Sequence, residues 1–194
     1  RGRLWEVFER RRRSQGERLF RLLVQLYGWQ YDFFYHLEQI LTTALRAWAE
    51  RPGYLKDLDG HREKEPQWFQ SEEMVGGVLY VDLFSDKLAA LPEHIAYFKQ
   101  TGLTYLHLMP LFAVPHGHND GGYAVSDYRA INPDIGTMEE LSALARILHD
   151  EGISLVLDFV MNHTSDEHIW AQRAKSGDPD FQEYYYTFAD RTLP

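Results

Sequence analysis

The sequence predicts an α/β chain in which a helical N-terminal region precedes parallel strands joined by helices. Two observations support this prediction. Over residues 1–50, apolar residues recur at steps of three and four, which is the period of an amphipathic helix. From Gly76 onward, short apolar runs alternate with helical stretches in the order strand–helix–strand–helix–strand. Strands connected in this way are parallel, with right-handed crossovers.

The first region is expected to be helical up to a stop signal. Gly28 interrupts the pattern, and Arg51-Pro52-Gly53 ends it. Helices with so broad an apolar stripe must pack on one another or on a neighbouring domain. Residues 55–75 are polar and are expected to form a linker. The stripe consists of Leu19, Leu22, Leu23, Leu26, Phe33, Phe34, Leu37, Ile40, Leu41, Ala44, Leu45 and Trp48.

Three nearly continuous apolar runs are expected as strands buried on both faces, at residues 78–84, 104–109 and 153–160. Pro110 ends the second run, and a helix from Leu91 to Gly102 is expected between the first two.

A second connecting helix is expected after Thr137, which occupies an N-cap position with Glu139 and Glu140 in the first turn. Gly152 closes this helix. Its apolar face consists of Leu141, Leu144 and Leu148.

This order of elements opens either a doubly wound sheet or a (β/α)₈ barrel. Ser85-Asp86-Lys87 follows the first strand where a nucleotide-binding sheet carries a glycine-rich phosphate turn, which argues against such a sheet. Three strands cannot close an eight-stranded barrel, so on that interpretation the barrel is incomplete in this chain. The expected domains are residues 1–75 (helical domain and linker), 76–163 (first part of the barrel) and 164–194 (start of the loop or insert after the third strand).

Composition excludes several classes of partner. The net charge is −9, from 29 acidic and 20 basic residues, so binding to nucleic acid or to an anionic membrane is not expected. The absence of cysteine excludes disulfides and thiolate metal sites. No apolar run reaches the roughly 20 residues of a membrane helix. A cytoplasmic protein with a neutral substrate is expected, although a trimmed N-terminus leaves a secreted form open.

In a barrel, working residues gather on the loops that follow the carboxyl ends of the strands. One such loop holds Gly122-Tyr123, Ser126-Asp127-Tyr128 and Asn132-Pro133; about 35 residues later comes Asp158-Phe159-Val160-Met161-Asn162-His163. These two motifs resemble the loop after the second barrel strand and the signature on the third barrel strand of the α-amylase family. Both motifs, in this order and on the expected elements, form a specific signal.

A finer resemblance is to the amylosucrase branch of that family. It implies transfer of a glucosyl unit from sucrose to an α-1,4-glucan acceptor with release of fructose, by a retaining double displacement without metal or other cofactor. The catalytic carboxylates of the family follow the fourth, fifth and seventh strands, so none is assigned within residues 1–194, and the chain alone is expected to be inactive. The stretches that carry the resemblance are residues 77–84, 105–112, 120–126, 162–165, 167–168, 170–173 and 185–186.

Two alternatives stay open: a sucrose hydrolase or α-glucosidase of the same family, and a barrel that serves as a non-catalytic binding scaffold. Oligomeric state also stays open.

The resemblance assigns substrate-binding roles to three residues. Tyr123 is expected as the platform under the glucosyl ring, Asp120 as the carboxylate that closes the bottom of the pocket with an Arg outside this chain, and His163 as a hydrogen-bond donor to the glucosyl 6-hydroxyl. Each has a simpler interpretation: a packed loop aromatic, an Asx-turn residue and an ordinary strand-end histidine. Asp158 and Asn162 are expected to give structural support.

Three further features bear on the site: a possible metal cluster, a strand histidine and a group of loop aromatics. His116 and His118 with Asp120 make a weak case for zinc, so no metal site is expected. His107 is expected to be a hydrogen-bonded interior histidine. The loop aromatics are expected to pack a loop over the barrel mouth, and whether any of them touches sugar stays open; they are Trp170, Tyr184, Tyr185, Tyr186 and Phe188.

Overall fold

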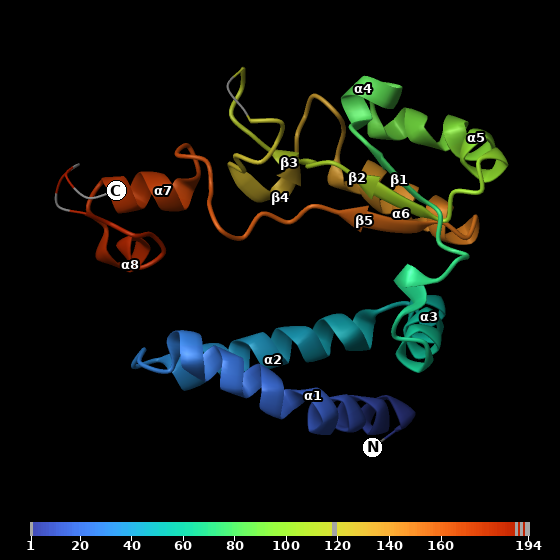
Figure 1. The fold of residues 1–194 in the computed structure, drawn as a ribbon. Coiled ribbons are helices and arrows are strands. Elements are labelled where there is room, and N and C mark those ends of the chain that lie inside the picture. Colours follow the sequence, from blue (N-terminus) through green and yellow to red (C-terminus); the bar gives the residue numbers. More distant parts are fainter. Residues whose placement is uncertain (1, 118–119, 189, 191, 193–194) are drawn as a thin grey trace. The chain divides into compact units, whose positions relative to one another are not determined.

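The computed structural model describes residues 2–117, 120–188, 190 and 192. Contacts divide the chain into two compact units, Arg1–Trp68 and Phe69–Pro194. The first unit is helical, and the second carries all the strands of the described chain (Figure 1). The domain bounds expected at residues 75 and 163 remain predictions.

The helical unit consists of α1 (Arg3–Tyr27), α2 (Phe33–Glu50) and α3 (Gly53–Lys64), followed by the 3₁₀ turn η1 (Trp68–Gln70). As predicted, helix stops before Gly28 and again before Arg51. Phe33 is buried and meets Phe20 edge to face, with 6.2 Å between ring centroids. Many large apolar side chains of this unit nevertheless stay exposed, including Leu22, Leu26, Phe34 and Ile40.

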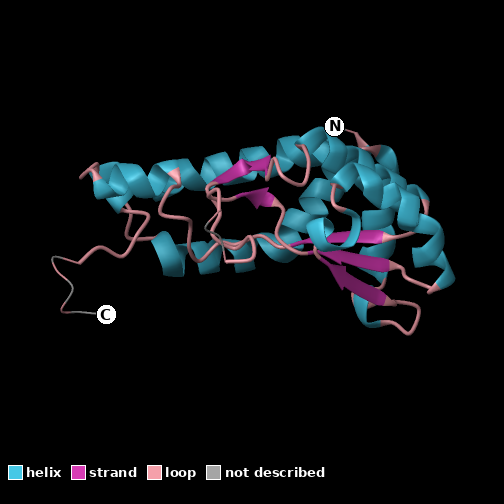
Figure 2. Cartoon of the chain, turned by 90° about the horizontal axis from the view of Figure 1, so that it is seen from above, coloured by secondary structure: helices cyan, strands magenta, loops and turns pink. Residues whose placement is uncertain are grey.

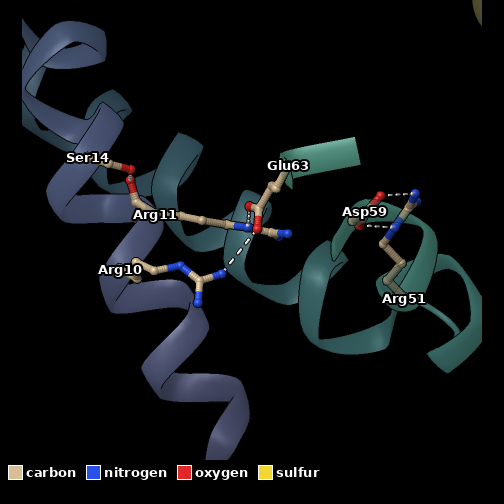
Figure 3. Close-up of polar contacts among 6 residues, drawn as sticks. All are labelled: Arg10, Arg11, Ser14, Arg51, Asp59 and Glu63. Carbon is tan, nitrogen blue, oxygen red and sulfur yellow. Dashed lines mark hydrogen bonds and ion pairs between the residues drawn. The ribbon is translucent and has the colours of Figure 1, made fainter. Parts of the chain in front are cut away.

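The linker predicted at residues 55–75 is wrong over its first half, which is helix α3. This helix has no buried residue, so no apolar stripe marks it in the sequence. Its polar side chains form ion pairs instead (Figure 3): Arg51 forms a bidentate pair with Asp59 at 2.8 and 3.0 Å. Glu63 accepts from Arg10 at 3.1 Å and also contacts Arg11 of α1.

The second unit is built on a parallel sheet of order β1-β2-β5, drawn in magenta in Figure 2. Its strands are β1 (Gly76–Leu79), β2 (Tyr105–Leu108) and β5 (Ser154–Leu157). Val78 lies opposite His107, and His107 lies opposite Val156. The predicted parallel order is thus confirmed, with strands shorter than expected at their carboxyl ends.

The first predicted strand, residues 78–84, is half wrong because Val81–Ser85 forms helix α4. A short apolar run gives no periodicity that separates a buried strand from a buried helix. The backbone N–H of Phe84 donates to the Tyr80 carbonyl at 3.1 Å, and the Phe84 ring stacks on Phe98 at 5.7 Å between centroids. Packing against the next helix therefore decides the conformation of this segment.

One face of the sheet is covered by helices. These are η2 (Leu88–His94, a 3₁₀ helix), α5 (Ile95–Gln100) and α6 (Met138–Asp150). Leu106 and Leu108 of β2 are fully buried against them and form the centre of the core. Burial of such a side chain stabilises the fold by about 2 kcal/mol. The opposite face, which carries Val78, His107 and Val156, is called the inner face below.

Helix α6 agrees with its prediction in detail. The Thr137 hydroxyl accepts from the Glu140 N–H at 3.2 Å, and the Glu140 carboxylate accepts from the Thr137 N–H at 2.8 Å, which forms a capping box. The predicted apolar residues Leu141, Leu144 and Leu148 are all buried in the core.

The remaining elements follow the carboxyl ends of β2 and β5 along the chain. β3 (Phe112–Ala113) pairs antiparallel with β4 (Asp127–Ile131). After β5, the chain continues through α7 (Ile169–Lys175) and α8 (Pro179–Gln182). In the part of the chain that the structure describes, no helix combines the length and apolar character needed to cross a bilayer.

A pH dependence follows from His168, the N-cap of α7. Its ring is only 4% exposed, and Nδ1 accepts from the Trp170 N–H at 3.1 Å. Burial lowers the pKa of His168, against an opposing effect of Asp127. Below a pH of about 6.5 the unfolded chain therefore binds more protons than the folded chain, so stability present above that pH is lost on acidification.

We expect the urea midpoint of the second unit to fall between about pH 7 and pH 5. His168→Asn keeps a capping acceptor without a titrating ring, so its midpoint should fall less over the same interval. Parallel curves for the two proteins would contradict this origin.

Candidate active-site edge

Two loops leave the carboxyl ends of neighbouring parallel strands and meet. The first follows β2 and carries Asp120 and Tyr123; the second follows β5 and carries Asp158 and His163. The Ser165 N–H donates to the Val125 carbonyl at 2.8 Å, which joins the two loops directly. Parallel strands place both loops at one edge of the sheet, as the sequence predicts.

Gly121 and Gly122 shape the first loop. Both have positive φ, at 79° and 93°, which is a left-handed backbone that side chains other than glycine rarely adopt. A Cβ on Gly122 would lie 2.9 Å from Cβ of Pro110, the residue predicted to end β2. The two glycines thus let the loop fold back closely on the end of the strand, which brings Tyr123 over the sheet edge.

Tyr123 and Asp158 are brought together. The Tyr123 hydroxyl donates to Asp158 Oδ2 at 3.2 Å, and His107 Nε2 lies 3.1 Å from Asp158 Oδ1. Loss of solvent, and then the charge and hydrogen bond of Asp158, raise the pKa of the Tyr123 phenol. The phenol therefore remains a donor at neutral pH. The support role expected of Asp158 fits these contacts and stays a prediction.

Tyr128 ties down the second loop. The single hydrogen of its hydroxyl is shared between the Val160 carbonyl at 2.7 Å and the His163 carbonyl at 3.0 Å, so it holds the chain on both sides of Asn162. Burial, and then neighbouring Tyr185, raises the pKa of Tyr128 and keeps this donor protonated. From the sequence, Tyr128 was identified only as part of a motif, and its hydrogen bonds to the second loop were not predicted.

The other expected site residues lie on the same loops with fewer contacts. Asp120 Oδ1 accepts from the Ala124 N–H at 2.6 Å, so the carboxylate stabilises its own loop through a residue four positions on. The side chains of His163 and Asn162 are exposed at the edge. Their expected sugar-binding and support roles, and the pocket role of Asp120, stay predictions.

An aromatic cluster lies beside the second loop. Tyr128 stacks on Phe159 at 5.4 Å and approaches His168 at 5.6 Å, and Trp170 connects His168 to Tyr184. The Tyr185 hydroxyl is 2.8 Å from Thr164 Oγ1. Of the aromatics expected to pack over the mouth, Trp170 contacts Tyr128 and Tyr185 contacts Thr164, whereas Tyr186 is 97% exposed.

The described residues contain no group of three or more His, Asp or Glu side chains arranged to hold a metal ion. His118, one of the residues considered as a zinc ligand, lies outside the described residues.

Removal of the Tyr128 hydroxyl should loosen the loop that carries His163. Tyr128→Phe keeps the ring but deprives two carbonyls of their shared donor, so we expect a loss of about 1 kcal/mol in unfolding free energy. Amide hydrogen exchange should quicken at residues 161–165. Tyr186→Phe is the matched control, because the ring of Tyr186 is almost fully exposed. Equal effects of the two substitutions would contradict the role given to Tyr128.

Comparisons with known proteins assign this part of the chain to a family. The family profile described as alpha amylase, catalytic domain, matches residues 70–193. A trehalose synthase of Pimelobacter is 40% identical over 124 residues, which cover 60% of this chain and 21% of that protein. Maltase 1 of Drosophila virilis is 39% identical over 98 residues, which cover 50% of this chain and 15% of the maltase. The chain spans between 15% and 28% of the length of the curated relatives it matches.

Solved structures give the same result. The trehalulose synthase of Pseudomonas mesoacidophila superimposes with a TM-score of 0.55 at 29% identity, over 62% of this chain and 23% of that chain. A mutant isomaltulose synthase of Erwinia rhapontici, in complex with its natural substrate sucrose, gives 0.53 at 30% identity, over 59% and 22%. The profile covers well over half of the chain. The chain therefore belongs to the α-amylase family, and its three parallel strands lie within the residues that match that family's catalytic domain.

Proposed function

We propose that the full-length protein carrying this chain is an amylosucrase: it transfers the glucosyl unit of sucrose to a growing α-1,4-glucan and releases fructose. Family membership supports a glycoside hydrolase or transferase. The similarity to an isomaltulose synthase solved with sucrose supports the donor. The finer choice rests on the resemblance of the stretches around Tyr80, His107, Tyr123 and His163 to amylosucrases.

The main support for this proposal is the contact between the loop after β2 and the loop after β5. The Tyr123 hydroxyl is held on Asp158, and the chain at His163 is held by Tyr128, so a flat aromatic ring and an imidazole come to one edge of the sheet. An aromatic face suits the C–H groups of a pyranose, and a ring nitrogen suits its hydroxyls. Such a pair fits a single neutral sugar ring.

In this proposal Tyr123 is the platform, His163 donates to the 6-hydroxyl, and Asp120 limits the depth of the pocket. One Asp120 oxygen already holds the loop through the Ala124 N–H. The other would pair with an Arg supplied by a later part of the protein, which would offset the cost of removing the carboxylate from water. This arrangement would admit one glucosyl unit and no more.

The proposed reaction proceeds by two displacements at the anomeric carbon. A carboxylate outside residues 1–194 attacks that carbon as the bond to the fructosyl oxygen breaks, and a protonated carboxyl group gives its proton to that oxygen. The 4-hydroxyl of the glucan then attacks the glucosyl-enzyme, loses its proton to the same group and frees the nucleophile. No nucleotide, metal or redox partner is needed for this balance.

Hydrolysis is the second candidate, and a specific observation favours it. The curated relatives include an α-glucosidase of Pediococcus pentosaceus, 35% identical over 100 residues, and several oligo-1,6-glucosidases. In that case water replaces the glucan hydroxyl in the second displacement. A non-catalytic scaffold remains the third reading, and the expected cytoplasmic location and oligomeric state stay predictions.

The test is to incubate the full-length protein with sucrose alone and to separate the products by chromatography. If the protein transfers the glucosyl unit to glucan, we expect fructose well in excess of free glucose, together with iodine-staining α-glucan. Equal amounts of glucose and fructose would instead support a hydrolase. No release of fructose would support the scaffold. The isolated chain of residues 1–194 is expected to release none.

Tyr123→Ala should lower kcat/KM for sucrose by about a hundredfold, because the ring orients the reacting sugar. Tyr186→Ala removes an exposed aromatic from the later loop and should leave turnover unchanged. Circular-dichroism spectra of both variants should match the parent, which would show that the fold is kept. Unchanged turnover in Tyr123→Ala would defeat the platform assignment.

A further inference from the structure

His107 occupies a position where an aliphatic residue would be expected. It lies in the middle of the inner face, between Val78 of β1 and Val156 of β5 in the strand register. A polar ring in such a place costs free energy unless it is hydrogen-bonded. Its Nε2 is 3.1 Å from Asp158 Oδ1, and both side chains are 25% exposed. A partly buried polar pair beside two valines of this face suggests a task beyond packing.

Asp158 uses its other oxygen for Tyr123. Because a carboxylate only accepts, the imidazole Nε2–H and the phenol O–H both donate, one to each oxygen. Three elements are joined in this way: strand β2, the residue after β5 and the loop after β2. We call this chain of contacts the His107–Asp158–Tyr123 relay.

The relay matters because it fixes the hydroxyl end of the Tyr123 ring. Gly121 and Gly122, which precede the ring, carry no side chains. The hydroxyl bond to Asp158 anchors the far end of the ring, and the backbone anchors the near end. Asp158 in turn holds that bond well only if its own carboxylate is prevented from rotating.

We infer that His107 is a positioning residue for the sugar platform: by holding Asp158 Oδ1, it orients Oδ2 to fix the ring of Tyr123. His107 acts through Asp158 and need not contact the sugar. The inference rests on the proposed function only in calling the ring a sugar platform. The relay itself is a property of the folded protein.

The first test observes the ring without any substrate. The full-length protein is labelled with 3-fluorotyrosine, and the Tyr123 resonance is assigned by its loss in Tyr123→Phe. His107→Gln keeps an amide donor near the position of Nε2, whereas His107→Asn is too short to reach Asp158; the two amides form a matched pair. His107→Leu is a second disrupting variant that suits the apolar face.

If the relay holds the ring, we expect the fluorine resonance of Tyr123 to shift and broaden in His107→Asn and His107→Leu. In His107→Gln it should stay near the parent position. A resonance unmoved in the folded Asn and Leu variants would overturn the inference. This outcome does not depend on whether the protein acts on sucrose, so failure of the relay and failure of the proposed function are distinguishable.

The second test measures turnover. His107→Leu should lower kcat/KM for sucrose about tenfold, and His107→Gln should restore most of it. In a Tyr123→Phe background, which lacks the hydroxyl, His107→Leu should cost little more, because the two substitutions break the same chain. Additive losses in the double variant, or a loss in Gln equal to that in Leu, would show that His107 acts by another route and overturn the inference.

Discussion

Parallel hydrogen bonding of β2 to β5, with His107 opposite Val156 and Leu108 opposite Leu157, decides where the polar residues at the sheet edge lie. Since side chains alternate along a strand, this register sends Leu106 and Leu108 into the helix-covered core and His107 to the inner face. Asp158 follows Val156 by two residues and so shares the face of His107. A shift of one residue would exchange these faces and separate the two side chains.

The fold was predictable where local chemistry and long-range packing agree. Thr137 and Glu140 specify the start of α6 by hydrogen bonds within four residues, so the sequence alone locates that helix. Val81–Ser85 and α3 were mispredicted for opposite reasons. The first is an apolar run whose conformation depends on Phe98, and the second is a polar helix fixed by Arg10, Arg51 and their acidic partners. Neither set of contacts produces a periodic pattern of apolar residues in the sequence.

At the candidate site, the sequence identified the loops better than the contacts within them. Tyr123, Asp158 and His163 stood out through a family resemblance, and two strands in parallel register bring their loops to the same edge. The roles of His107 and Tyr128 depend on partners 51 and 32 to 35 residues away. Alternation of His107 with Leu106 and Leu108 predicts an interior histidine, but no local pattern reveals that Asp158 is its partner.

We propose that the loops carrying Tyr123 and His163 together bind one glucosyl ring. The most direct measurement is a crystal structure of the full-length protein soaked with glucose. We expect a pyranose lying on the Tyr123 ring, with its 6-hydroxyl within hydrogen-bond distance of the His163 imidazole. Glucose bound elsewhere, or a Tyr123 ring turned away from Asp158 and from the sugar, would contradict it.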